Sequence, residues 1–146
     1  MDDDIGREIA ASFGVLIQRS TRSGLYAALV EGIADGLDEN AYPVLSGLAR
    51  TGPRNAADLA AVVGLDRSGV SRHASRLEAA GLVRREPDPA DRRSVLLVLT
   101  DAGAAAVEQM RGRFVERVSA SLAAWPPGEA EAFARGLRRF VEEGPF

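Results

Sequence analysis

Apolar residues recur at helical spacing through the first part of the chain. Ile9, Phe13 and Ile17 are four positions apart and share one face of a helix. The pattern is interrupted at Thr21–Gly24 and then resumes. A single helix with a bend at this interruption is therefore predicted over residues 5–33.

The next apolar segment contains a proline, which locates the start of its helix. Proline destabilises a helix interior but fits a first turn, because the amide hydrogen that it lacks has no partner there. Pro43 therefore predicts a helix that begins close to Tyr42 and ends near Arg50. Gly36 is expected to stop the preceding helix, and Asp38 to cap this one.

Two short helices joined by a tight turn are predicted over residues 55–80. Asn55 is expected to cap the first helix and Asp66 the second, each through its side-chain oxygen. Gly64 would supply the turn, since glycine adopts backbone conformations that other residues resist. Small and apolar side chains are expected to hold the helices at a steep angle: Leu59, Ala60, Val63, Leu65, Val70 and Leu77.

A β-hairpin is predicted after this helix pair. Leu82–Glu86 reads as a short strand, and Ser94–Leu99 is rich in β-branched and apolar residues. The segment Pro87–Asp91 between them contains two prolines and two aspartates, which favour a turn.

The end of the chain predicts two further helices. Thr100 or Asp101 is expected to cap a long helix whose apolar positions continue to Leu122. The segment Trp125–Gly128 would end it, and its prolines are placed to open a final helix with Phe133 on its apolar side. The predicted fold is mainly α with a small β-hairpin.

Charge changes this picture because it is unevenly distributed. The 146-residue chain has a net charge of −3, and all 18 basic residues are arginines. Residues 67–93 hold seven arginines against four acidic residues, a net of +3, which leaves −6 for the remainder. A local positive region in an acidic chain is typical of a specific surface for a polyanion such as DNA.

The second short helix has a polar face suited to the major groove of DNA. At 100° per residue, Ser68, Arg72 and Ser75 lie opposite the apolar side, with Ser71 and Arg76 more lateral. Arginine can bind guanine through two hydrogen bonds, and serine can meet phosphates or base edges. The alternative is a solvated helix face without function.

The hairpin adds a second basic element. Arg84 and Arg85 lie along its first strand, and Arg92 and Arg93 follow its turn. A basic hairpin tip can reach the adjacent minor groove, whose negative potential favours arginine. Asp91 could orient these guanidinium groups by accepting their hydrogen bonds. The alternative is a surface cluster of ion pairs.

The chain resembles the MarR family, the multiple-antibiotic-resistance type of bacterial regulator. The resemblance rests on the helix pair Leu59–Leu77, on the Asp-Arg-Arg-Ser turn Asp91–Ser94, and on Val98–Gly103, which reads Val-Leu-Thr-Asp-Ala-Gly. It covers residues 40–104 by motif, while the flanking helices match only in length and order. Pro43 departs from the family pattern, as does the absence of the cysteine found in oxidant-sensing members.

The resemblance implies a winged helix-turn-helix flanked by long dimerisation helices. The expected divisions are an N-terminal dimerisation helix at 1–36, the DNA-binding domain at 37–100 and C-terminal dimerisation helices at 101–146. It also implies a homodimer that represses transcription from an inverted-repeat operator, with half-sites about one helical turn, ~10 bp, apart.

The resemblance also implies roles for individual residues. Arg93, with Arg92 beside it, would read the minor groove and be positioned by Asp91. Arg54 would contact a phosphate. Five residues would face the major groove: Ser68, Ser71, Arg72, Ser75 and Arg76.

Effector binding is expected only by analogy. Many relatives bind small, often aromatic or phenolic, anions between the dimer helices and the DNA-binding domain. Arg22, Tyr26 and Tyr42 are the candidates in this chain, although they could equally be packing or surface residues. A regulator without any effector therefore stays open.

Competing classes of function lack support in the sequence. There is no cysteine, and the one histidine, His73, has no second histidine with which to hold zinc, so neither a metal nor a cofactor is expected. No nucleophile elbow, phosphate loop or histidine dyad indicates an enzyme. A winged-helix dimer that acts through a protein partner would need an acidic or blocked recognition face, unlike the Ser/Arg face here.

The location of the protein is also an expectation. The chain has no run of 18 apolar residues, and it begins Met1-Asp2-Asp3-Asp4, whereas a signal peptide needs a basic start and an apolar run. A cytoplasmic protein without a membrane segment is expected.

Overall fold

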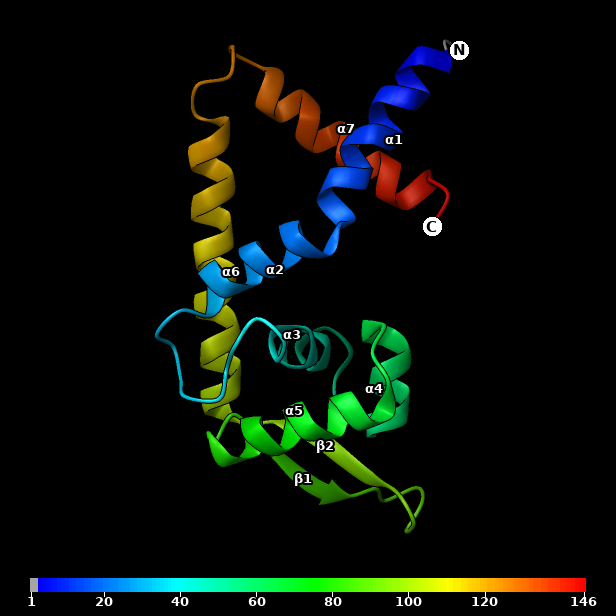
Figure 1. Cartoon of the computed structure of the whole chain (residues 1–146), viewed down its shortest axis with the longest axis vertical. Helices are drawn as coiled ribbons and strands as arrows, with labels where there is room; N and C mark the ends of the chain where they lie inside the picture. The colour runs from blue at the N-terminus through cyan, green and yellow to red at the C-terminus, as the bar shows by residue number, and fades with distance from the viewer. Residues whose placement is uncertain (1–2) are drawn as a thin grey trace. The chain divides into compact units, whose positions relative to one another are not determined.

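Within residues 3–146, which the structure describes, the chain forms seven helices and one antiparallel hairpin (Figure 1). The structure is a computed structural model. By internal contacts it divides into two units, Met1–Arg111 and Gly112–Phe146. No helix of the described residues is long and apolar enough to span a membrane.

The N-terminal segment forms two helices, α1 (Asp3–Ile17) and α2 (Arg19–Val30). The predicted break at Thr21–Gly24 is wrong, because the extended residue is Gln18, with φ −64° and ψ 146°. The Gln18 side chain then donates to Thr21 Oγ1 over 2.9 Å. The helix also ends earlier than predicted, at Val30.

Helix α3 (Tyr42–Thr51) begins where the proline predicted, with Pro43 in its first turn. Asp38 does not cap it directly. Its Oδ1 atom accepts hydrogen bonds from the amides of Asn40 and Ala41, at 3.0 and 2.9 Å. Asp38 therefore organises the turn that leads into α3.

Two short helices and the two strands follow in order: α4 (Ala56–Val63), α5 (Arg67–Ala79), β1 (Val83–Pro87) and β2 (Val95–Leu99). The strands pair in one register, from Val83 opposite Leu99 to Pro87 opposite Val95. The hairpin, here called the wing, was thus predicted to within a residue. The side chains that close the core of this unit are fully buried: Leu29, Leu45, Leu48, Leu59, Val70, Leu77 and Val83.

Helix α6 (Asp101–Leu122) is joined to the base of the wing by Thr100. The Thr100 hydroxyl donates to the carbonyl of Gly81 (2.7 Å) and accepts from the amide of Gly103 (3.0 Å). Gly103 packs so closely that a Cβ atom there would overlap the carbonyl oxygen of Leu82. This contact explains the Thr-x-x-Gly pattern in physical terms.

The unit Gly112–Phe146 contains the end of α6 and helix α7 (Glu129–Glu143). The prolines precede α7 instead of opening it, and the residue at its N-cap is Gly128, with φ +84°. The ring of Trp125 contacts that of Phe133, with centroids 5.5 Å apart. Apolar side chains remain exposed on this unit: Phe114, Val115, Val118, Phe133, Leu137 and Val141.

Candidate nucleic-acid interface

Helices α4 and α5 form the helix-turn-helix predicted from the sequence. Asn55 Oδ1 accepts the amide of Asp58 at 2.8 Å and so caps α4. Gly64 follows α4 with φ +73°, the left-handed conformation that favours glycine. The predicted cap of α5 is wrong in detail, since Asp66 occupies the N-cap position but its carboxylate accepts no capping hydrogen bond.

The apolar side of α5 is fully buried. Val70, Ala74 and Leu77 have no exposed surface, as predicted. Leu65 in the turn is 38% exposed, however, so it does not close the core as predicted. The buried side fixes the rotation of α5, and its polar side divides into two flanks and a central strip.

The wing-side flank, Ser71 and Ser75, is bound by β1. Arg85 Nη2 donates to Ser75 Oγ at 3.2 Å and to the carbonyl of Ser71 at 3.4 Å. Arg85 Nη1 also pairs with Glu78 at 2.8 Å. The Ser75 hydroxyl donates to the Ser71 carbonyl at 3.0 Å. Arg85 therefore joins the wing to α5, although the sequence had suggested only a basic strand.

The loop-side flank, His73 and Arg76, faces the segment between α2 and α3. Arg76 Nη2 lies 2.7 Å from Asp38 Oδ2. Partial burial alone would raise the pKa of Asp38, but hydrogen bonds from Arg76 and from two backbone amides, together with the Arg76 charge, lower this pKa below its ordinary value. The pair is thus ionised at neutral pH and is lost only in acid, as the pH falls through the lowered pKa.

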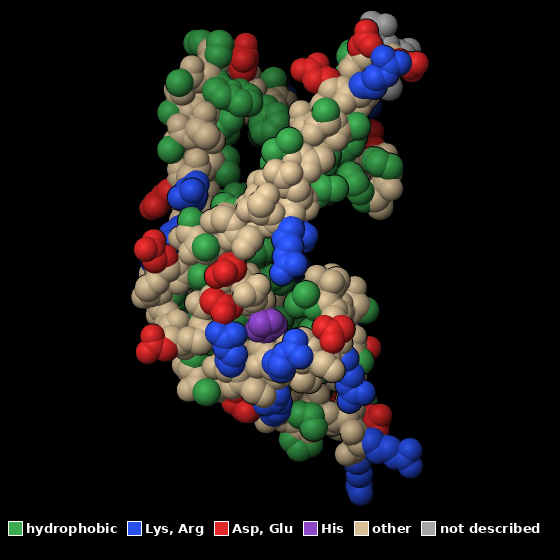
Figure 2. Space-filling model, in the orientation of Figure 1, with side chains coloured by type: hydrophobic (Ala, Val, Ile, Leu, Met, Phe, Trp, Pro, Cys, Tyr) green, Lys and Arg blue, Asp and Glu red, His purple; other side chains and the backbone are tan. Residues whose placement is uncertain are grey.

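The central strip, Ser68 and Arg72, is exposed and lies between the two flanks. Among the described residues, Arg72 forms no ion pair, and neither does Arg67 at the start of α5. Basic side chains gather over α5 and the wing on the face seen in Figure 2. The central strip is therefore the part of α5 that is available to bind a groove.

The wing tip is a hydrogen-bonded turn that presents two exposed arginines. Asp91 Oδ1 accepts the backbone amide of Arg93 at 3.0 Å, and the carbonyl of Asp91 accepts the amide of Ser94. In the described part of the chain Asp91 pairs with neither guanidinium, so it orders the backbone of the turn. Arg92 and Arg93 are left exposed, with no acidic partner among residues 3–146.

Arg54 extends the wing through its backbone. Its amide and carbonyl pair with those of Leu97 at 3.3 and 2.8 Å, as an isolated bridge beside β2. The Nε atom of Arg54 is buried without a hydrogen-bond partner in the structure. Part of this guanidinium is thus desolvated, and its predicted phosphate contact stays a prediction.

A cleft of about 300 Å³ brings together two of the three candidate effector residues. Arg22 and Tyr26 line it, while Tyr42 stacks on Tyr26 with ring centroids 4.2 Å apart. His73 reaches the cleft from α5, and its Nδ1 atom is buried without a partner in the structure. Sequence reasoning did not connect the remaining lining residues, which meet only through the fold: Arg19, Ser23, Glu39, Asn40, Pro43 and Leu65.

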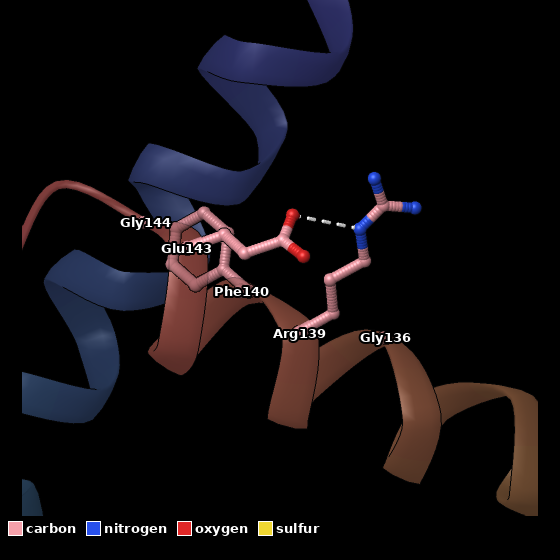
Figure 3. Close-up of a pocket in the computed structure, with 5 residues that line it drawn as sticks. All are labelled: Gly136, Arg139, Phe140, Glu143 and Gly144. Atoms are coloured by element: carbon pink, nitrogen blue, oxygen red, sulfur yellow. Dashed lines mark hydrogen bonds and ion pairs between the residues drawn. The ribbon is translucent and has the colours of Figure 1, made fainter.

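A second hollow, of about 360 Å³, lies on α7 (Figure 3). Its lining includes Phe140, Glu143 and Arg139, whose Nε atom pairs with Glu143 Oε2 at 2.9 Å. All of its lining residues come from α7 and the glycine that follows, so it is an open surface of one helix. No group of three or more potential metal ligands occurs among the described residues.

Comparison with known proteins gives a family match over this region. A model described as MarR family matches residues 35–94. The uncharacterised HTH-type transcriptional regulator YxaD of Bacillus subtilis is 32% identical over 118 residues, which are 81% of this chain and 82% of that protein. The HTH-type transcriptional repressor NicR of Pseudomonas putida is 31% identical over 101 residues, 69% of this chain and 64% of NicR.

Solved structures share the fold. The apo form of wild-type MarR from E. coli has a TM-score of 0.72 and 24% identity, covering 93% of this chain and 94% of that one. BpsR of Bordetella bronchiseptica has a TM-score of 0.61 and 24% identity, covering 95% of this chain and 99% of that one. The binding of BpsR to DNA is regulated by 6-hydroxynicotinic acid. The helix-turn-helix, the wing and these relatives agree: the chain belongs to the MarR family of transcriptional regulators and is not an enzyme.

Proposed function

We propose that the chain is a homodimeric, sequence-specific repressor that acts in the bacterial cytoplasm and is relieved by a small molecule. The observation that carries DNA recognition is the difference between paired and unpaired arginines on one unit. Among the described residues, Arg72 on α5 and Arg92 and Arg93 on the wing are exposed without acidic partners, whereas three nearby arginines are paired with carboxylates: Arg76, Arg84 and Arg85. Unpaired arginines on a helix and an adjacent hairpin fit the two grooves of a duplex.

Each proposed DNA contact follows from its position. Arg72 and Ser68 enter the major groove and read base edges, while Arg93 and Arg92 enter the minor groove. Ser71, Ser75 and Arg54 are engaged within the protein and are better suited to phosphate contacts at the edge of the interface. Asp91 holds the turn that presents Arg93.

Dimerisation is supported by uncovered apolar surface on each unit. On α1, Ile5 and Ile9 are 52% and 40% exposed, and on α7, Phe133 and Leu137 are 47% and 43% exposed. Contiguous exposed apolar side chains mark contact surfaces for other chains. Two-fold symmetry then requires an inverted-repeat operator with half-sites ~10 bp apart.

Effector relief is proposed for the cleft lined by Arg22 and Tyr26, where Tyr42 stacks on Tyr26. A guanidinium beside stacked rings suits a small aromatic or phenolic anion, through charge and ring contacts. The regulation of BpsR by 6-hydroxynicotinic acid makes that compound a reasonable first ligand. Because the cleft also contains His73 of α5, a bound ligand would bias the position of the recognition helix.

The direct experiment is selection of bound duplexes from a random pool, with and without 6-hydroxynicotinic acid. The proposal predicts an inverted repeat, and less recovered DNA when the ligand is present. A pool that shows no enriched sequence would contradict specific binding. If the ligand does not change the enrichment, wild-type protein and Arg22→Gln would be titrated with related phenols. A lack of response to every phenol would remove the effector role.

A further inference from the structure

The loop-side flank of α5 is held by the segment between α2 and α3 through two independent contacts. One is the ion pair between Arg76 and Asp38, at 2.7 Å. The other is steric: Gly36 has φ +88°, and a Cβ atom at this position would lie 3.1 Å from the carbonyl oxygen of Arg76. The loop therefore packs directly against the C-terminal half of the recognition helix.

The charge of this loop argues against contact with DNA. Asp35, Asp38 and Glu39 lie within five positions, and no basic residue occurs between Val30 and Tyr42. These carboxylates would be repelled by phosphates if this flank approached the duplex. Arg76 is neutralised by the Asp38 carboxylate, so its charge is already used within the protein.

We infer that Asp38 is a positioning residue for operator binding, which acts through Arg76, and that Arg76 orients the recognition helix instead of contacting DNA. Arg85 fixes the opposite flank of α5 to the wing. With both flanks held, the central strip Ser68 and Arg72 is presented to the groove in one orientation. Preorganisation of this kind strengthens binding, because less order has to be gained on association.

This inference rests on the proposed DNA binding. It predicts a change in DNA affinity opposite in sign to the change expected if Arg76 binds a phosphate. If Arg76 bound phosphate and Asp38 competed for it, removing the Asp38 charge would strengthen DNA binding. If Asp38 positions the helix, the same change weakens binding. The two side chains are 48% and 33% exposed, and partly exposed pairs contribute up to about 1 kcal/mol, so the expected effect is about two- to fivefold in Kd.

The experiment compares wild-type protein, Asp38→Asn, Arg76→Gln and the double variant on the selected operator by fluorescence anisotropy. Asparagine keeps an oxygen that can accept the amides of Asn40 and Ala41, so the turn should persist. Thermal melting and sedimentation verify that each variant is folded and has the wild-type association state. Asp35→Asn is the charge-matched control, because Asp35 lies exposed in the same loop and its carboxylate forms no ion pair within residues 3–146.

The positioning role predicts that both single variants weaken binding two- to fivefold and that the double variant is no worse than either. The slope of log Kd against log salt should stay unchanged, since no phosphate contact is lost. Asp35→Asn should leave binding unchanged or slightly tighter.

Two results would overturn the inference. One is tighter binding by Asp38→Asn together with a salt slope reduced by about one for Arg76→Gln, which would make Arg76 a phosphate contact. The other is additive losses in the double variant, which would mean that the two residues act separately. Failure of the wild-type protein to bind any duplex would instead reject the proposed function itself.

Discussion

At the scale of single residues, the arginines of α5 and the wing differ in their partners. Arg85 and Arg84 pair with Glu78 and Glu86 at 2.8 and 2.6 Å, whereas Arg72 has no acidic partner among the described residues. A carboxylate beside a paired guanidinium offsets the charge that would attract a DNA phosphate. The unpaired arginines are therefore expected to contribute most of the DNA-binding energy. Residue type alone does not distinguish them from the paired arginines.

Arg72→Ala should weaken operator binding by about 1–3 kcal/mol, because one bidentate contact to a base would be lost. Binding to random duplex should change much less. The measurement is Kd for both duplexes at one salt concentration. An equal loss on random DNA would make Arg72 a phosphate contact instead.

Arg93→Ala should also weaken operator binding, by roughly tenfold or more, because an arginine proposed to enter the minor groove is lost while the proposed dimer contacts are unchanged. Arg84→Ala is the matched control, since Arg84 lies on the same hairpin but is paired with Glu86. Sedimentation reports the association state of both variants. Unchanged operator affinity for Arg93→Ala at physiological salt would remove the wing from the recognition mechanism.

At the scale of elements, local patterns predicted most of the structure. The caps, Gly64 and the breaker-rich turn between Pro87 and Asp91 located α4, α5 and the wing, because each acts over a few residues. The break at Gln18 was missed, since nothing in its residue type marks an extended conformation.

The partners of the two α5 flanks could not be predicted from the sequence. Asp38 and Arg76 are 38 positions apart, and Arg85 meets Ser75 across two elements, so only the assembled core brings them together. The cleft is similar, since His73 and Arg22 are far apart in the sequence and line one cleft only in the folded chain. The outward positions of Ser68 and Arg72, by contrast, followed from helical periodicity.

The junction between the wing and α6 gives a stability prediction. Gly103→Ala should destabilise the fold by about 1–3 kcal/mol, because the added Cβ would overlap the Leu82 carbonyl. Gly112→Ala on the same helix meets no atom within 4 Å and should stabilise by about 0.5–1 kcal/mol. Urea unfolding measures both variants. Equal behaviour of the two would contradict the close packing at Gly103.

At the scale of the whole molecule, the proposed function requires a second copy of the chain. Leu137→Glu should convert the proposed dimer to a monomer. It places a charge between Phe133 and Val141 on the apolar side of α7, and this side would face the second copy. Arg138→Glu, exposed on the same helix, is the control with the same new side chain. Light scattering after size exclusion gives the mass, and a wild-type mass of one chain would contradict the proposed dimer.

Sequence-specific binding by α5 and the wing is tested most directly by the ratio of two dissociation constants. These are the Kd for the selected inverted repeat and the Kd for a shuffled duplex of the same composition, measured with wild-type protein at physiological salt. The proposed function predicts a ratio of about 10³ or more, typical of specific regulators. Equal affinity for the two duplexes would contradict it.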